Sequence, residues 1–403
     1  MTDAETLAER VREGDLRLYE LEDHADPDTA AAARRRLLAE ETGADLSTVG
    51  DYGFAAGEAD SNIENMIGTA QIPMGVVGPL PVDGGAAEGD HYLPLATTEG
   101  ALLASVNRGV STIRTAGGAT ARVLKSGMTR APVFKVEDVA AAGEVSGWVR
   151  EHVDDLAAAA EATTSHGELQ GVTPYVVGDN VFLRFSYDTK DAMGMNMATI
   201  ATEAACEVVE RETPAELVAL SGNLCSDKKP AAINAIEGRG RTVSADVLLP
   251  HEQVEQRLDT TTDAVVEANT RKNLVGSAKA GALGFNAHAA NVIAAAFLAL
   301  GQDAAQVVEG ANTITTVDAR EDGLYASVTL SSLEVGTVGG GTSLPTQSEA
   351  LDVLGYGGGG DPAGSNADAL AEVVAAGVLA GELSLLAALS SRHLSSAHAE
   401  LGR

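Results

Sequence analysis

Three of the few lysines in this chain lie in two short segments, where they could act as fixed positive charges. The 403 residues contain only seven lysines; Lys228 and Lys229 lie between Asp227 and Pro230, and Lys272 lies further on. A proline restricts the residue before it to an extended backbone, so the first segment is predicted to be a loop. Such a lysine either belongs to a solvated loop, where pairing with an aspartate contributes less than about 1 kcal/mol, or stabilises a developing oxyanion or a bound carboxylate. The spacing alone leaves both interpretations open.

Two acidic residues occupy positions at the ends of predicted helices. Glu99 follows Thr97 and Thr98 at a helix start, where an acid ordinarily interacts with the helix dipole. A catalytic acid would instead need a dry site that favours its protonated form. Asp303 ends an apolar helix predicted over residues 286–300. Because the dipole there disfavours a carboxylate, we expect Asp303 to have a cationic partner.

Histidines and methionines supply the other candidates for chemistry. His393 and His398 lie in a Ser/His-rich tail. Each is interpreted either as a solvated side chain or as a mobile proton donor. Residues 191–197, Asp-Ala-Met-Gly-Met-Asn-Met, lie between a predicted strand and a predicted helix. Their backbone amides and the helix N-terminus could bind phosphate, or the methionines could fill a gap between elements. Cys225 is predicted to be a buried small residue rather than a nucleophile.

The glycine-rich runs argue against a Rossmann fold. Residues 339–341 are glycines after a strand-like run, but no Gly-x-Gly-x-x-Gly opens a βαβ unit with a downstream acid. The two cysteines, Cys206 and Cys225, form no Cys-x-x-Cys pair, so no structural zinc site and no other metal site is predicted.

The elements that must position these residues predict an α+β fold. Residues 1–57 are expected to form polar helices, one over residues 30–40 capped by Asp28 and stopped by Gly43. Residues 64–80 are apolar and rich in Gly and Pro, which predicts buried turns near a ligand. A helix over residues 101–108 is expected to begin at a Thr97 or Thr98 cap, and a glycine connection follows at 117–118.

Residues 132–219 have the pattern of a separate small domain. Strands are expected at 133–136, 169–177, 180–187 and 216–220, and helices at 145–162 and 198–212. In the third strand Val181, Leu183, Phe185 and Tyr187 alternate with other residues, which is the period of a half-buried strand. The order β-α-β-β-α-β predicts a ferredoxin-like, split βαβ arrangement.

Residues 58–131 and 220–403 are expected to form one large mixed α/β domain around a buried central helix, residues 286–300. A second long helix is predicted over residues 367–389. The apolar run 291–300 is too short to cross a bilayer, and the longer run 373–390 contains Glu382. With no signal peptide at the N-terminus, the chain is predicted to be soluble and cytoplasmic.

The charge is strongly negative. Asp and Glu number 58 against 27 Lys and Arg, a formal net charge of −31. Such a field repels polyanions, so nucleic acid and an anionic membrane surface are excluded as main partners. An acidic surface with few lysines is typical of proteins from a salt-rich cytoplasm, where the Debye length falls to about 3 Å at 1 M salt.

A set of motifs running from about residue 64 to the C-terminus closely resembles the 3-hydroxy-3-methylglutaryl-coenzyme A (HMG-CoA) reductase family. The motifs are Glu64-Asn65-Met66-Ile67-Gly68 with 73–80, Ala96-Thr97-Thr98-Glu99-Gly100, Gly127-Met128-Thr129-Arg130, 191–197, Ser221-Gly222-Asn223, Asp227-Lys228-Lys229-Pro230, Ile236-Glu237-Gly238-Arg239-Gly240, 272–277, Asn286-Ala287-His288, Gly301-Gln302-Asp303 and 336–342. Residues 1–57 resemble the family only weakly.

The resemblance implies a two-step reduction of the HMG-CoA thioester by NADPH to mevalonate and free coenzyme A. The catalytic residues it implies are Glu99 as proton donor, Lys228 at the oxyanion, Asp303 as a bridge between these two, and His398 as the acid that protonates the leaving thiolate. A non-catalytic protein that binds coenzyme A esters is the alternative class, and the presence of all four residues argues against it, because a binder needs no proton donor.

The resemblance also implies three groups of binding residues. For the hydroxymethylglutaryl group they are Arg130, Ser221, Asp227, Lys229, Lys272 and Asn291. For coenzyme A they are Glu64, Asn65, Ser105, Asn107 and Arg108. For the nucleotide, held by the small domain, they are Ser165, His166, Asp191, Met193, Gly194, Met195, Asn196 and Gly340.

The family resemblance implies the soluble biosynthetic class, with NAD-dependent degradative oxidation of mevalonate as the alternative. His166 stands where many relatives have an arginine near the 2′-phosphate of NADP, so the preference for NADPH is expected to be smaller. After His398 only Ala399, Glu400, Leu401, Gly402 and Arg403 follow, so no phosphorylatable serine follows this histidine. The family's site forms between subunits, which implies a homodimer or homotetramer.

Overall fold

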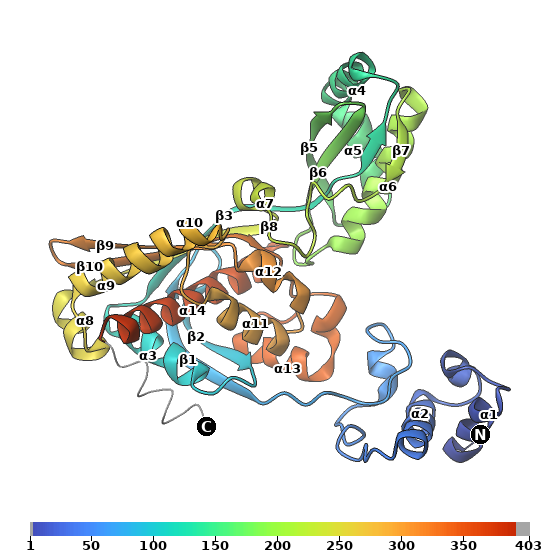
Figure 1. The fold of residues 1–403 in the computed structure, drawn as a ribbon, viewed down its shortest axis with the longest axis horizontal. Coiled ribbons are helices and arrows are strands. Elements are labelled where there is room, and N and C mark those ends of the chain that lie inside the picture. The colour runs from blue at the N-terminus through green and yellow to red at the C-terminus, as the bar shows by residue number, and fades with distance from the viewer. Residues whose placement is uncertain (1–2, 392–403) are drawn as a thin grey trace.

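The structure, a computed structural model, describes residues 3–391 as a mixed α/β protein built on one sheet (Figure 1). Its strands are β1 (Met74–Asp83), β2 (Glu88–Ala96), β3 (Ala119–Arg130), β4 (Val133–Lys135), β5 (Glu168–Val177), β6 (Asn180–Asp188), β7 (Glu216–Ala219), β8 (Gly240–Pro250), β9 (Thr313–Arg320) and β10 (Gly323–Leu333). Its α-helices are α1 (Ala4–Glu13), α2 (Pro27–Thr42), α3 (Leu102–Thr115), α4 (Val139–Glu151), α5 (Val153–Glu161), α6 (Met195–Glu212), α7 (Ala232–Glu237), α8 (His251–Leu258), α9 (Thr262–Ala268), α10 (Ser277–Ala280), α11 (Ala289–Ala299), α12 (Val307–Gly310), α13 (Pro345–Leu354) and α14 (Ser365–Ser390). Short 3₁₀ segments are η1 (Leu18–Asp23), η2 (Ala56–Ala59), η4 (Ala304–Gln306) and η5 (Gly340–Ser343), and η3 (Asn269–Gly276) is a π-helix.

Strand β3 joins the two halves of the sheet. Its first part pairs with β8 and, in parallel, with β1, while its last residues, Met128 to Arg130, pair with β6. The strand order is β7-β4-β6-β3-β8-β10-β9, with β2 on β1 and β5 on β6, and every pair except β1 with β3 is antiparallel. The long β3 therefore fixes residues 132–219, which we call the small unit, relative to the rest of the chain, which we call the large unit from residue 58 on.

The small unit has the predicted ferredoxin-like order. Its elements follow one another along the chain as β4-α4-α5-β5-β6-α6-β7, and the sheet order β7-β4-β6-β5 is antiparallel throughout. The predicted alternation in β6 is confirmed: Val181, Leu183, Phe185 and Tyr187 are buried in a core shared with α5 and α6. The single helix predicted over residues 145–162 is wrong, because the backbone leaves the helical region at His152, between α4 and α5.

The large unit is built around α14. Of its 26 residues, 20 are buried, and α14 packs on β8, β10, β3, α3 and α11 (Figure 1). Helix α3 approaches closely because Gly109 has no side chain: a Cβ there would lie 1.9 Å from the carbonyl oxygen of Ala380. The length and hydropathy of α14 would suffice for a membrane span, but 78% of its most apolar window is covered by other parts of this protein. It is a core helix in this structure.

Two buried acids on α14 hold neighbouring loops. Glu372 accepts hydrogen bonds from the backbone N–H groups of Gly85, Ala86 and Ala87 at 2.8–2.9 Å. Glu382 accepts them from the backbone of Ala287 and His288 at 2.6 and 2.7 Å. Burial without such partners would be costly, so these acids connect the helix to the β1–β2 turn and to the start of α11. The predicted helix over residues 286–300 is α11, which begins three residues later, and α14 is the more buried of the two.

Two helix caps differ from the sequence predictions. The cap of α2 is Asp26, which accepts from the backbone of Thr29 at 3.0 Å, and not Asp28; Gly43 ends the helix as predicted. Helix α3 begins at Leu102 after Ala101, whose φ is 70°, so neither Thr97 nor Thr98 caps it. Threonine was expected to cap because its hydroxyl suits that position, but here the Thr97 hydroxyl accepts from the Glu99 backbone at 3.0 Å within the preceding turn.

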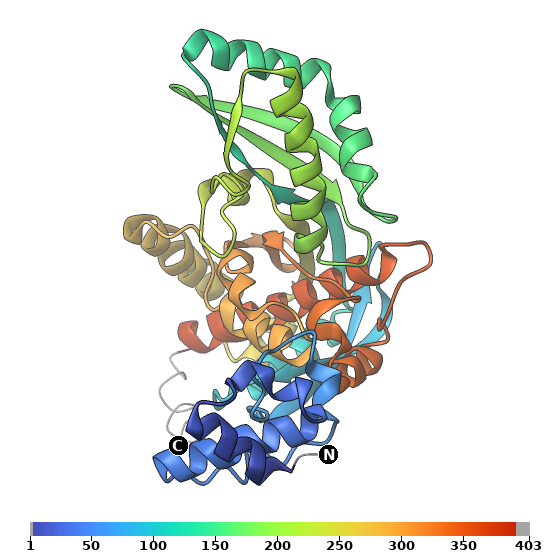
Figure 2. The same cartoon turned by 90° about the vertical axis from the view of Figure 1, so that its right-hand side faces the viewer.

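The N-terminal helices and the small unit lie at opposite ends of the molecule (Figure 2). The segment that leads into β1, and the start of β1 itself, are only partly buried within one chain. Of residues 64–80, Met66, Val77 and Leu80 are buried, whereas Ile72, Met74 and Val76 are exposed. The prediction of buried turns over residues 64–80 is therefore confirmed only in part, because the elements of this chain leave some of these apolar side chains uncovered.

Candidate active site

Lys228 and Asp303 form an ion pair. Lys228 lies in the loop between β7 and α7 with φ 58°, and its Nζ is 2.8 Å from Oδ2 of Asp303, which follows α11. The hydrogen bond that the Lys228 ammonium donates to Asp303 raises the pKa of Lys228, so the ammonium stays charged at neutral pH. The expectation that Asp303 needs a cationic partner is confirmed. The side chains are 46% and 30% exposed, so the pair can meet a ligand.

A buried cluster under the Lys228 loop was not predicted from the sequence. We call Arg239, Asp227, Glu309 and Glu334 the Arg239 cluster. The fully buried guanidinium of Arg239 lies 3.0 Å from Asp227, 2.8 Å from Glu309 and 3.1 Å from Glu334. Burial opposes the charge of Arg239, but the three carboxyl groups outweigh it and raise its pKa. Arg239 belongs to a motif that resembles the family, but a glycine-flanked arginine by itself gave no indication of burial.

Glu99 is held by Asn291 on the other side of the candidate site. The Nδ2 of Asn291 donates to Oε1 of Glu99 at 3.4 Å and lies 3.5 Å from Nδ1 of His288. The other ring nitrogen of His288 lies 2.8 Å from the carbonyl oxygen of Gly381, so it must be the N–H donor and Nδ1 the acceptor. His288 thus orients Asn291, which in turn orients Glu99. Within residues 3–391 no hydrogen bond joins Glu99 to Asp303 or Lys228, so the predicted bridge is present on the lysine side only.

The remaining substrate-binding candidates are placed by different elements. Lys229 donates from Nζ to the Asp227 carbonyl at 3.2 Å and is exposed. Lys272 lies in the π-helix η3, a feature that frequently marks functional sites. Arg130 ends β3, and its buried Nε has no hydrogen-bond partner in the described structure. Ser221 is exposed in the loop after β7.

Residues 191–197 and the glycine-rich loop 336–342 lie side by side. The Thr337 backbone N–H donates to the Asp191 carbonyl at 2.8 Å, and Ala192 pairs with Val338 as a parallel bridge. Gly194 precedes the 18-residue α6 with φ 86°, and a Cβ there would lie 2.3 Å from the Thr189 side chain. Because the first turn of a helix leaves backbone N–H groups without partners inside the helix, this segment stays a candidate for binding phosphate.

The carboxylate of Asp191 is fully engaged inside the protein. It accepts four backbone hydrogen bonds of 2.7–3.1 Å, from Gly360, Gly364, Asn366 and Ala367 at the start of α14. Asp191 therefore shapes the loop and does not present its side chain. Met193 and Met195 pack partly against the small core, Asn196 is exposed, Ser165 and His166 are exposed between α5 and β5, and Gly340 begins η5.

The coenzyme A candidates on α3 make internal hydrogen bonds. The Ser105 hydroxyl lies 2.9 Å from that of Ser384, and Arg108 donates to the same hydroxyl at 3.1 Å. Asn107 accepts from the Gly78 backbone at 3.1 Å. Glu64 and Asn65 are exposed. His398 lies outside the described residues.

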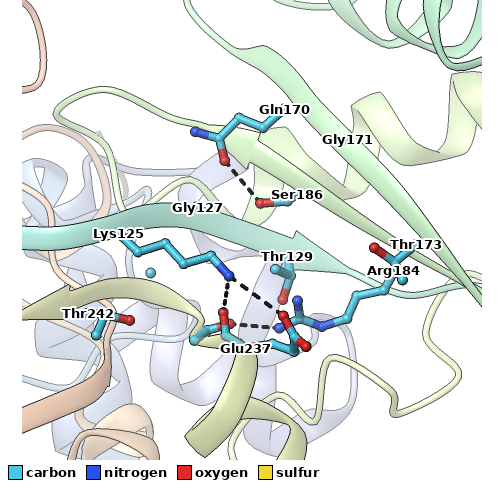
Figure 3. Close-up of a pocket in the computed structure, with 12 residues that line it drawn as sticks. Lys125, Gly127, Thr129, Gln170, Gly171, Thr173, Arg184, Ser186, Glu237 and Thr242 are labelled. Carbon is cyan, nitrogen blue, oxygen red and sulfur yellow. Dashed lines mark hydrogen bonds and ion pairs between the residues drawn. The ribbon is translucent and has the colours of Figure 1, made fainter.

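A polar cavity of about 250 Å³ opens where β3 meets the small unit (Figure 3). Lys125 reaches Glu237 across it, with Nζ 3.7 Å from the carboxylate, and Arg184 donates to the Gly238 carbonyl at 2.7 Å. Glu237 and Gly238 precede Arg239, so the cavity wall leads into the Arg239 cluster. An apolar cavity of about 610 Å³ lies near the exposed segment before β1 and includes Phe54, Met66 and Leu298.

The sequence places the chain in a known family. The hydroxymethylglutaryl-coenzyme A reductase family matches residues 30–403. The chain is 73% identical to the 3-hydroxy-3-methylglutaryl-coenzyme A reductase of Haloferax volcanii over 403 residues, with both chains fully covered. It is 72% identical to that of Halobacterium salinarum over 402 residues, covering 100% of this chain and 99% of the relative. This chain therefore belongs to the HMG-CoA reductase family.

The fold is shared with a solved structure. The chain superposes with a TM-score of 0.68 on the class II 3-hydroxy-3-methylglutaryl-CoA reductase of Streptococcus pneumoniae bound to NADPH in open conformations, at 20% identity, covering 93% of this chain and 100% of the other. The likeness confirms the fold class predicted from the sequence.

Proposed function

We propose that this protein reduces HMG-CoA to mevalonate and coenzyme A with two NADPH, as a soluble cytoplasmic enzyme of isoprenoid lipid biosynthesis. The observation that carries the proposal is the Lys228–Asp303 ion pair at 2.8 Å, in a chain of this family. Both partners are partly exposed, so an ammonium of fixed position is available to a ligand.

The residues that we assign to NADPH are of types that suit this group. The positive-φ Gly194 precedes α6, and the loop at 336–342 lies beside it, so a helix N-terminus and a glycine-rich loop are available to a phosphate. The bound nucleotide supplies hydride. His166 and the hydroxyl of Ser165 are exposed on the neighbouring loop and are the donors we assign to the 2′-phosphate.

Each catalytic side chain has a role that follows from the charge it handles. Hydride addition to the thioester places negative charge on the carbonyl oxygen, and the Lys228 ammonium stabilises that oxygen. Expulsion of coenzyme A as thiolate requires a proton, which we assign to His398. Reduction of the aldehyde that remains requires a second proton, which we assign to Glu99, held in place by Asn291.

Binding of the substrate carboxylate is assigned to Arg130, Lys229 and Lys272. A carboxylate in a protein pocket needs charge-assisted donors, and these three cations come from β3, the Lys228 loop and η3 respectively. Asp227, Ser221 and Asn291 complete this pocket, and Glu64, Asn65 and the α3 residues are assigned to coenzyme A.

A second copy of this chain completes the proposed site. Lys228 with Asp303, and Glu99 with Asn291, form two groups that no hydrogen bond joins within residues 3–391. Ile63, Ile72 and Met74 are exposed apolar side chains beside the apolar cavity, as expected of a subunit contact. We therefore propose a homodimer or homotetramer. The molar mass measured by light scattering as the protein elutes from a size-exclusion column would distinguish these assemblies from a single chain.

The test is nicotinamide absorbance at molar KCl in both directions. NADPH with HMG-CoA should be consumed, and NADH should be used less well. Faster reaction with mevalonate, coenzyme A and NAD⁺ than with HMG-CoA and NADPH would instead support the degradative reaction. No reaction in any combination, with coenzyme A esters still bound, would support a binding protein.

A further inference from the structure

We propose that the Arg239 cluster positions Lys228 for the reaction, with Glu309 fixing the lysine backbone and Arg239 fixing its neighbour Asp227. The inference rests on the proposed function, because it concerns how the oxyanion-stabilising ammonium is held in place. None of the residues Arg239, Glu309 or Glu334 needs to contact substrate for this role. They are positioning residues.

The Lys228 loop has a backbone that needs support. Asn223, Ser226 and Lys228 all have positive φ, at 61°, 44° and 58°. Residues other than glycine adopt this conformation at a cost and keep it only where the surroundings impose it. The loop is partly exposed, and the Asp303 pair acts on the mobile end of the lysine side chain. A separate contact must therefore hold the backbone.

Glu309 supplies that contact from below the loop. One carboxylate oxygen accepts a hydrogen bond from the Lys228 backbone N–H, and the other accepts from Arg239 at 2.8 Å. Glu309 is fully buried, so the bond is shielded from water. It lies six residues after Asp303, so one short stretch, through η4 and α12, carries both the partner of the lysine side chain and the partner of the lysine backbone.

Arg239 extends the same support to Asp227 and to the proposed nucleotide segment. Its guanidinium binds Asp227 at 3.0 Å and donates to the sulfur of Met195 at 2.8 Å, at the start of α6. Gln306 adds a hydrogen bond to Asp227 at 3.2 Å. A single buried arginine thus connects the lysine loop to the helix assigned to the nucleotide.

Glu334 completes the cluster. Burial, and then the neighbouring Glu309, raise the pKa of Glu334. Its Oε1 lies 3.1 Å from the Arg239 guanidinium, so it closes the buried shell around that group.

The test compares Glu309→Gln with Glu372→Gln. Glu372 is an equally buried carboxylate that holds backbone N–H groups, but it acts on the β1–β2 turn. Activity is measured per folded enzyme with HMG-CoA and with mevaldehyde. Glu309→Gln should lower kcat about 10- to 100-fold in both assays, because displacement of a reacting group by about 1 Å costs up to about 10²-fold. KM should stay within about threefold, and Glu372→Gln should leave kcat unchanged.

The pH profile separates positioning from general loss of structure. Asp303 raises the pKa of Lys228 in the wild type, so a displaced lysine loses this effect and the alkaline limb of kcat should move to lower pH in Glu309→Gln. If that variant does not fold, Arg239→Lys, which keeps the buried charge, is measured in the same way with the same expectations. A kcat that falls no further than in Glu372→Gln, or an unmoved alkaline limb, would overturn the positioning role. An inactive wild type would instead refute the proposed function.

Discussion

Replacement of Lys228 by alanine tests whether this lysine is catalytic. A catalytic lysine should affect turnover strongly and the thermal midpoint weakly, whereas a surface lysine should affect neither. Its side chain is 46% exposed and that of Asp303 is 30% exposed. A pair this exposed contributes about 1 kcal/mol or less to the free energy of unfolding. For a chain of this length such a change lowers the thermal midpoint by at most about 2–4 °C. We therefore expect Lys228→Ala to remain folded.

The effect on turnover should be much larger. Loss of one donor to an oxyanion typically costs about 10²–10³ in kcat, equivalent to about 2.7–4 kcal/mol. The substrate carboxylate keeps Lys229, Lys272 and Arg130, so KM should change less than kcat. The assay is NADPH oxidation with HMG-CoA, with the thermal midpoint measured on the same sample.

Lys135→Ala is the matched control, because Lys135 is an exposed lysine on β4 and has no assigned role in the site. It should change neither kcat nor the thermal midpoint. Near-normal turnover in Lys228→Ala would refute the reasoning and leave the lysine segment as a solvated loop.

Four further outcomes are expected. Activity and thermal midpoint should rise steeply up to about 1 M KCl, because salt screens the repulsion among the net −31 charges; equal stability and activity at about 50 mM would contradict this. The thermal stability of Glu334→Gln should rise relative to that of the wild type as pH rises above about 4.3. The reason is that the pKa of Glu334 is raised in the folded wild type, so the unfolded chain releases a proton at a lower pH than the folded chain does. A stability difference that does not change with pH would show that the pKa of Glu334 is not raised. His398→Gln should impair HMG-CoA reduction more than mevaldehyde reduction, since only the first expels a thiolate, and equal losses would indicate a structural role. His166→Ala should lower the NADPH-to-NADH ratio of kcat/KM, because it removes a donor that we assign to the 2′-phosphate; an unchanged ratio would remove His166 from the site.

The sequence was sufficient where local pattern and tertiary structure agree. The alternation in β6, the strand–helix boundary at residues 191–197 and the Gly43 stop all follow from short-range stereochemistry. Asp303 has the cationic partner that the sequence predicted, Lys228, but it lies four residues after α11 and caps η4 instead of ending the apolar helix.

The sequence was insufficient where distant segments meet. Glu309 lies 70 residues after Arg239, and Glu334 lies 25 residues after Glu309. No local pattern in the sequence indicates that the Arg239 guanidinium binds both acids. The exposed apolar residues Ile72 and Met74 were expected to be buried, because composition shows that a side chain prefers to be covered but not by which chain. Whether Ser105 and Arg108 bind a ligand or α14 depends on the crossing at Gly109, which is a tertiary contact.

The stoichiometry of the reaction distinguishes an NADPH-dependent HMG-CoA reductase from the alternatives. Conversion of a thioester to an alcohol requires two hydrides and releases one thiol. With limiting HMG-CoA in molar KCl, we expect two NADPH to be oxidised for each coenzyme A thiol released, measured by nicotinamide absorbance and thiol titration in one cuvette. A ratio of one, thiol release without NADPH oxidation, or a preference for NADH would contradict it.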